Sequence, residues 1–162
     1  MRQLPTLLIL TALIVTLATS LTACKDEPAL DGRPISEWVS LLRHSDWAMQ
    51  QKASDTLVRS GVLAVPYLSK GIATKDPTLR RWSAVTLGRI GPEAKESVPA
   101  LLTRITREEV PMIRAAILKA LANIAPKDPK VIAEFEKRAA RDVDPEVKAA
   151  AKAGLNADKP KP

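Results

Sequence analysis

The sequence predicts an all-α protein: a short right-handed α-α superhelix of about four helix pairs that follows an N-terminal signal helix. Three observations predict this fold class. Alanine and leucine are abundant, whereas the 162 residues contain only six glycines. No run alternates apolar and polar residues as a half-buried strand does. A two-helix pattern also recurs along the chain from residue 35 to residue 157, and such repetition is typical of solenoids.

The first 23 residues have the layout of a secretory signal peptide. One basic residue, Arg2, precedes a long uncharged run that is rich in leucine and ends in small residues. A membrane-spanning helix is the alternative for an apolar run of this length. However, five threonines and a serine dilute the run, and no Lys/Arg cluster follows it. We therefore expect residues 1–23 to be cleaved.

Residues 21–24 read Leu-Thr-Ala-Cys and contain the only cysteine of the chain. This motif resembles the lipobox of bacterial lipoproteins, in which an aliphatic residue and two small residues precede a cysteine. The resemblance implies that Cys24 is acylated and becomes the first mature residue. It also implies a lipid anchor in the outer or plasma membrane of a bacterial envelope, with the domain facing the periplasm or the exterior. Two or three acyl chains hold a protein durably, whereas one holds it only marginally.

The mature chain is expected to be basic and to have loose ends. Removing residues 1–23 removes Arg2 from the 25 basic residues and none of the 18 acidic residues, which leaves a net charge of +6. Residues 24–34 are polar and contain proline and glycine, so they are expected to form a lipid-anchored tether. The charged, proline-containing residues 158–162 are expected to be a disordered tail.

Four units of two helical segments are predicted between these ends, at residues 35–61, 64–91, 96–125 and 130–157. Apolar residues of the second segments align at offsets of 30, 34 and 34 residues: Met49, Leu79, Ile113 and Val147, then Leu57, Leu87, Leu121 and Leu155. The first segments align in the same way at Ile35, Val65, Val98 and Ile132. Both helices of a unit carry an apolar stripe, so each unit needs a neighbour on either side, and stacking in a row supplies one.

Local signals place the start of each second helix. Asp or Glu and Pro recur at the turns between the two helices of units two to four. Aspartate accepts hydrogen bonds from the free amides of a first helical turn, and proline lacks the amide that would go unpaired there.

The segments "VPALL" at 98–102 and "DPTLRRWSAVTLGRIGPEA" at 76–94 resemble HEAT repeats, of the short variety found in phycobilisome-lyase-like proteins. "GRPISEWVSLL" at 32–42 resembles the helix that leads into such repeats in bacterial proteins. The resemblance implies a scaffold or adaptor whose second helices line the binding face. Two features depart from the pattern: Trp47 stands at the usual proline, and Glu-Glu-Val precedes Pro111.

Residues that support catalysis or metal binding are scarce. The single histidine, His44, lies in a predicted turn. The acids of residues 142–146 alternate as in a calcium loop, but the required glycine and distal glutamate are missing. The paired acids Glu108 and Glu109 lie at a helix junction. We therefore predict no catalytic site, no metal, no cofactor and no small-molecule substrate.

A column of polar residues has two interpretations. Gln50, Arg80, Arg114 and Lys148 occupy equivalent positions near the start of the second helices. They form either a positive stripe for an acidic partner or an internal ladder, in which each base pairs with an acid of an adjacent turn, such as Asp76 or Asp144.

Arginine and tryptophan are enriched at binding hot spots, so those on the second helices are candidates. Trp82 is either packed between units or offered to a partner, and Trp47 in its turn is a candidate exposed anchor. The residues predicted to bind a protein partner are Arg80, Arg81, Trp82, Arg89, Arg114, Lys148 and Trp47.

The leading functional hypothesis is a lipid-anchored scaffold or adaptor that binds an acidic protein partner at the cell envelope without catalysis. A nucleic-acid-binding, glycosylase-like domain is an alternative because the sequence pI is about 9.8, although an exported protein is not expected to meet nucleic acid. A lyase-type protein acting on a cofactor-bearing partner is a further alternative.

Overall fold

The computed structural model describes residues 27–157. The predicted signal peptide at 1–23, Cys24 and the predicted tail at 158–162 lie outside the described residues. Within the described part, no helix combines the length and the apolar character needed to cross a bilayer.

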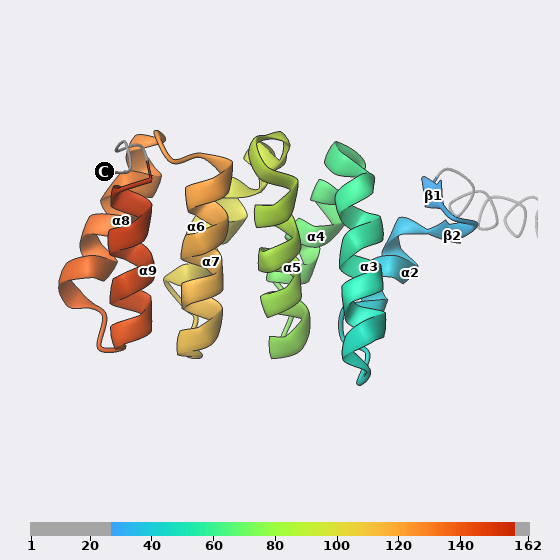
Figure 1. The fold of residues 1–162 in the computed structure, drawn as a ribbon, viewed down its shortest axis with the longest axis horizontal. Coiled ribbons are helices and arrows are strands. Elements are labelled where there is room, and N and C mark those ends of the chain that lie inside the picture. The colour runs from blue at the N-terminus through green and yellow to red at the C-terminus, as the bar shows by residue number, and fades with distance from the viewer. Residues whose placement is uncertain (1–26, 158–162) are drawn as a thin grey trace, which may run out of the picture.

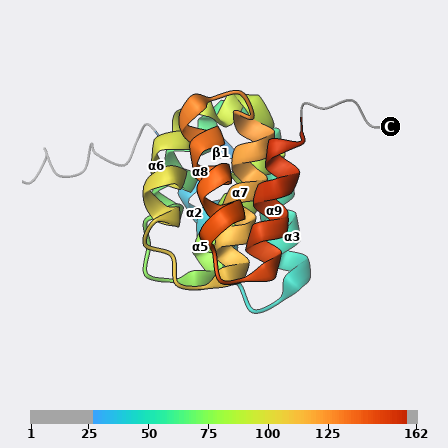
Figure 2. The same ribbon diagram turned by 90° about the vertical axis from the view of Figure 1, so that its left-hand side faces the viewer.

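The described chain is an α-solenoid of stacked helix pairs, which confirms the all-α fold class. The first helices are α2 (Ile35–Leu41), α4 (Val65–Ile72), α6 (Val98–Ile105) and α8 (Pro129–Arg141). The second helices are α3 (Trp47–Arg59), α5 (Pro77–Ile90), α7 (Pro111–Ile124) and α9 (Pro145–Leu155). Figure 1 shows the second helices side by side in one row. The view along that row in Figure 2 shows α6 and α8 on one side of the molecule and α3 and α9 on the other.

Short 3₁₀ segments connect the units at the end opposite the turns within units. Residues Gly61–Ala64 lead into α4, and Gly91–Ser97 lead into α6. Both segments begin at a glycine with positive φ, 53° at Gly61 and 76° at Gly91. Glycine adopts this conformation without the steric cost that a Cβ atom brings, so it lets the chain leave one helix and start the next within a few residues.

Aspartate caps set the start of most second helices. The side chain of Asp46 accepts a hydrogen bond from Ala48 N, and that of Asp76 accepts one from Leu79 N. Asp144 accepts bonds from the amides of both Glu146 and Val147. Because Asp46 supplies this cap, helix α3 begins at Trp47 without the proline that the other second helices have.

The core lies between the two layers of helices and continues through all units. Of the four aligned leucines, Leu57, Leu87 and Leu121 are at most 1% exposed, as the repeat pattern predicts, whereas Leu155 is half-buried. One polar contact crosses this core: the hydroxyls of Ser54 and Thr86 are hydrogen-bonded at 2.9 Å between α3 and α5.

The fourth unit departs from the predicted register. Ile132 aligns with buried Val98 in sequence, but Ile132 is only half-buried, and its neighbour Val131 is fully buried instead. Helix α8 spans 13 residues, compared with eight in α4 and in α6. It starts directly at Pro129 with Asp128 as its cap, so it has no 3₁₀ lead-in like that of α4 and α6.

The segment expected to be a loose tether is folded from Glu27 onward. Strands β1 (Ala29–Leu30) and β2 (Arg33–Pro34) form an antiparallel hairpin. The Glu27 carboxylate accepts hydrogen bonds from Ser36 N at 2.6 Å and Ser36 Oγ at 2.9 Å. Trp38 Nε1 donates to Leu30 O at 2.9 Å. The hairpin therefore covers the first unit, and only residues 24–26 of the predicted tether lie outside the described residues.

Candidate functional site

The two arginines of the predicted column form an internal ladder between units. Arg80 donates from Nε to Glu108 Oε2 at 2.8 Å and from Nη2 to Glu108 Oε1 at 3.1 Å. Its Nη1 donates to the backbone oxygens of Thr74 at 3.3 Å and Lys75 at 2.7 Å. One guanidinium thus holds the turn before its own helix and the acid of the next unit.

Arg114 repeats this arrangement one unit further along. It donates to both carboxylate oxygens of Asp142 at 2.9 and 2.8 Å. Its Nη1 donates to the backbone oxygens of Glu108 at 3.2 Å and Glu109 at 2.9 Å. We call these two buried pairs, Arg80–Glu108 and Arg114–Asp142, the arginine ladder.

The ladder changes the assignment of the site residues. Arg80 and Arg114 are only 6% and 7% exposed, so they do not offer their charge to a partner. The acids also differ from those that the sequence suggested, because Asp76 and Asp144 cap helices and the arginines instead reach Glu108 and Asp142. We therefore leave both arginines out of the candidate binding surface.

A second layer of arginines supports the ladder acids. Arg104 Nε donates to Glu108 at 2.9 Å, and Arg138 Nη1 donates to Asp142 at 3.2 Å. Burial alone would raise the pKa of Glu108. The hydrogen bonds from Arg80 and Arg104 outweigh it and lower that pKa from 4.5 to about 2. Burial also raises the pKa of Asp142. The hydrogen bonds from Arg114 and Arg138 outweigh this effect and lower the pKa from 3.8 to about 2. Both acids are therefore ionised near neutral pH.

The ends of the column lie outside the ladder. Gln50 and Lys148 are half-buried, and in residues 27–157 neither side chain takes part in an ion pair.

The two candidate tryptophans have opposite environments. Trp82 is 8% exposed and belongs to the hydrophobic core, so it packs inside the solenoid. Trp47 is 67% exposed at the start of α3, as a surface anchor requires.

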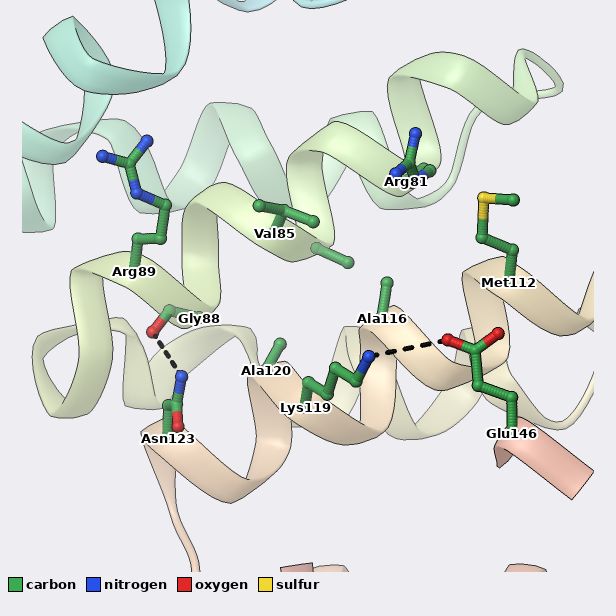
Figure 3. A pocket seen from close by; sticks show the side chains of 11 residues that line it. Arg81, Val85, Gly88, Arg89, Met112, Ala116, Lys119, Ala120, Asn123 and Glu146 are labelled. Atoms are coloured by element: carbon green, nitrogen blue, oxygen red, sulfur yellow. Dashed lines mark hydrogen bonds and ion pairs between the residues drawn. The ribbon is translucent and has the colours of Figure 1, made fainter. Parts of the chain in front are cut away.

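A groove lies between the second helices α5 and α7 and has a cavity volume of about 260 Å³. Figure 3 shows its floor of small side chains and backbone, with longer polar side chains around the rim. The lining residues are Arg81, Ala84, Val85, Gly88, Arg89, Met112, Ala116, Lys119, Ala120, Asn123 and Glu146. Two of the predicted site residues, Arg81 and Arg89, are among them.

Small residues along both helices shape the floor of this groove. A Cβ atom on Gly88 would lie 2.9 Å from Ala120 Cα, so the backbones of α5 and α7 approach as closely there as glycine permits. Asn123 Nδ2 donates to Gly88 O at 3.3 Å beside this contact. Farther along, Ala84 and Ala116 also line the groove with side chains that fill little of it.

The rim carries three exposed cations in different states. The Arg81 side chain makes no ion pair or hydrogen bond within residues 27–157. Arg89 donates to Asp55 Oδ1 at 2.6 Å and to Ser54 Oγ at 2.8 Å. Lys119 Nζ lies 3.6 Å from Glu146 Oε1, and both side chains are 64% exposed. An incoming anion therefore meets one unpaired cation and two that are paired at the surface.

A second hollow of about 210 Å³ adjoins the groove toward the turn between α6 and α7. Arg81 and Met112 line both hollows, so the two form one trough along the junction of units two and three. Met112 is 53% exposed and Val110 is 39% exposed, which adds apolar surface next to the cations.

The sequence pattern alone did not single out several groove residues. The positions of unit two that are equivalent to Met112, Lys119 and Asn123 hold Thr78, Val85 and Arg89, so the repeat pattern does not mark these three residues of α7. Lys148 and Trp47 do not line the groove.

The single histidine of the chain, His44, does not line the groove. His44 is an exposed turn residue whose Nδ1 accepts a hydrogen bond from Asp46 N at 3.1 Å. In residues 27–157, no group of three or more His, Cys, Asp and Glu side chains is placed to hold a metal ion.

Stacked helix pairs joined by repeated turns define the chain as an α-solenoid repeat protein. A family model described as HEAT repeats matches residues 35–109 and 93–156. The chain therefore belongs to the HEAT-repeat family. HEAT repeats are typical of protein-interaction scaffolds, and the family is generally not enzymatic. Comparisons with curated proteins and with solved structures found no match to this chain.

Proposed function

We propose that this protein is a lipid-anchored, non-catalytic scaffold or adaptor that binds another protein at a bacterial cell envelope. The observation that carries the binding role is the groove between α5 and α7. It joins an apolar floor to Arg81, which is exposed and unpaired within residues 27–157, on a fold used for protein interaction. Interfaces commonly combine an apolar centre with arginine anchors.

The anchoring role rests on the sequence of residues 21–24. A lipid on Cys24 would hold the repeat domain close to the membrane, because Glu27, only three residues later, is already hydrogen-bonded to Ser36 of α2. Three extended residues span at most about 10 Å. Such confinement raises the effective concentration of the domain toward partners in the same membrane.

The anchor is tested by metabolic labelling of cells with a fatty acid that carries a detectable tag. The full chain should incorporate the label and stay with the membrane fraction, and Cys24→Ala should do neither. Equal labelling of the two chains would contradict the proposal of an acylated Cys24.

The binding role is tested by chemical crosslinking in intact envelopes, followed by purification of the chain and mass spectrometry. We expect a reproducible protein partner whose recovery falls strongly in Arg81→Glu. The matched control is Lys52→Glu, which makes the same change of charge at an exposed α3 residue that does not line the groove. A partner pattern that is identical in both variants would exclude the groove as the binding surface.

A further inference from the structure

Resting on the proposed binding role, we propose that the groove recognises an extended acidic segment of the partner that carries an apolar side chain, and that Glu146 competes with this segment for Lys119. The length of the trough, the charges on its rim and the residues of its floor favour such a segment.

The trough is long enough for a short extended peptide. Its two hollows are lined along α5 from Pro77 to Arg89. A helix rises 1.5 Å per residue, so this distance is about 18 Å. An extended chain advances about 3.3 Å per residue, so about five residues of a partner fill the trough from end to end.

The rim charges select for acidic residues. Three of the groove-lining side chains are cations, Arg81, Arg89 and Lys119, whereas Glu146 is the one acid among the lining residues. A basic segment would meet these cations without compensation. A carboxylate that reaches Arg81 meets a guanidinium with no competing partner in the described chain, so this contact requires no existing bond to break.

The floor selects for an apolar side chain between the acids. The accessible apolar surface of the groove comes from Val85 and Ala116, which are half-buried, and from Met112, which is 53% exposed. Methionine has a flexible and polarisable side chain that adapts to different apolar partners. Covering this surface removes apolar area from water, which a purely polar segment would not do.

Glu146 occupies the place of a ligand carboxylate. Its Oε1 lies 3.6 Å from Lys119 Nζ, and Figure 3 shows this pair crossing the side of the groove between α7 and α9. An exposed ion pair of this kind contributes little stability, about 0.2–1 kcal/mol. A partner carboxylate can therefore displace it at small cost, and removing Glu146 should favour binding.

The test begins with selection from a random display library of peptides about ten residues long, using the full chain purified in detergent. We expect the selected peptides to be net acidic, with an apolar residue between the acids. Selection of basic or uncharged peptides would overturn the proposal, and so would the absence of any enrichment.

The affinity of one selected peptide is then measured by fluorescence anisotropy against matched variants. Arg81→Glu should weaken binding about tenfold or more, as loss of a binding anchor does, while Lys52→Glu should change it little. Glu146→Gln should tighten binding about two- to fivefold, the effect of freeing Lys119 from a surface pair. Its control is Glu136→Gln, which removes an exposed acid on α8 that does not line the groove. Equal effects of Arg81→Glu and Lys52→Glu, or of Glu146→Gln and Glu136→Gln, would overturn the proposal.

The crosslinking, peptide-selection and labelling experiments distinguish failure of the groove assignment from failure of the anchor. If crosslinking returns a partner whose recovery is independent of Arg81, and no acidic peptide is selected, the scaffold role stands and the groove assignment fails. If acidic peptides bind through Arg81 but Cys24→Ala retains its label, the groove assignment stands and the anchor fails.

Discussion

At the scale of single residues, the arginine ladder connects neighbouring repeats of this solenoid through buried ion pairs. Each ladder arginine makes four hydrogen bonds that join the turn of its own unit to an acid of the next. The spacing of the column predicted a ladder as one of two interpretations, but it did not predict the acids. Arg114 reaches past the capping Asp144, whose Oδ1 already accepts bonds from helix amides, to Asp142 two residues earlier in the turn. Arg80 reaches Glu108 at the equivalent position, two residues before Val110.

Removing one side of a ladder pair should destabilise the fold strongly. Arg114→Ala leaves the Asp142 carboxylate buried with only the longer hydrogen bonds from Arg138 Nη1 and Asp144 N, so we expect a loss of about 3 kcal/mol in the free energy of unfolding. The free energy is measured by urea denaturation followed by circular dichroism. Arg141→Ala, at an exposed neighbouring position, serves as the control and should change it by less than about 0.5 kcal/mol. A loss for Arg114→Ala no larger than for this control would contradict a structural role of the ladder.

The ladder acids also predict how stability depends on pH. The pKa of Glu108 is 4.5 as its ordinary value and about 2 in the folded protein, so the unfolded chain binds its proton more readily. The stabilisation from Glu108 is therefore complete above about pH 4.5 and is lost as the pH falls toward 2. Asp142, with its pKa lowered from 3.8 to about 2, acts in the same direction.

Urea denaturation between about pH 6 and pH 2 measures this dependence. Stability should fall below about pH 4.5 in the native sequence and fall less steeply in Glu108→Gln, which has no carboxylate to protonate at that position. Glu109→Gln changes the exposed neighbour and should keep the native slope. Identical slopes for Glu108→Gln and the native chain would rule out Glu108 as a source of the acid sensitivity.

At the scale of helices, the sequence predicted the existence and order of every second helix correctly, since the apolar spacing is joined at each start by a capping aspartate, a proline or both. It predicted less well where these signals are weak. The hairpin of residues 29–34 has strands too short to show alternation, although Asp31-Gly32 is a strong turn signal. The register of α8 shifted because alignment of Ile132 with Val98 did not account for the helix start at Pro129.

Among the second helices of the four described pairs, α7 alone has no capping side chain. Val110 occupies the position that Asp46, Asp76 and Asp144 hold in the other three. Val110→Asp should therefore stabilise the protein by about 0.5–1 kcal/mol. The fourth unit shows that the geometry tolerates this change, since Asp144 caps α9 while its amide donates to Asp142.

The comparison that isolates the cap is Val143→Asp, which adds the same side chain at an exposed residue that precedes a capping position. We expect no gain in melting temperature for this control. If both substitutions raise the melting temperature equally, the gain comes from added negative charge rather than from a cap on α7.

At the scale of the molecule, the repeat pattern predicts a row of units, but it does not predict where grooves lie on the surface. Whether a groove opens between two second helices depends on small differences at equivalent positions, such as Trp82 in unit two and Ala116 in unit three. The close approach at Gly88 and Ala120 is a property of the packed pair, so the sequence of either helix alone does not reveal it. The charges on Arg81 and Arg89 were visible in the sequence, whereas the hollow between them was not.

The row also predicts that stability is uneven along the solenoid, because each unit contacts only its neighbours. The α5–α7 junction is the most extensive between second helices, and the α3–α5 junction is the least extensive. The first unit also lacks a ladder pair, since Gln50 stands in place of an arginine. Its side-chain polar links to α5 in the described residues are the Ser54–Thr86 hydrogen bond and the bonds of Arg89 to Ser54 and Asp55.

We therefore expect α3 to open before α5 and α7 do. In native-state hydrogen exchange, the amides of α3 should exchange through a local opening of lower free energy, and those of α5 and α7 through global unfolding. Gln50→Leu, which alters the first unit without disturbing a ladder pair, should change exchange in α3 and leave α5 and α7 as they are. Uniform protection across α3, α5 and α7 would instead mean that the units unfold together. The difference between the junctions would then be too small for α3 to open separately.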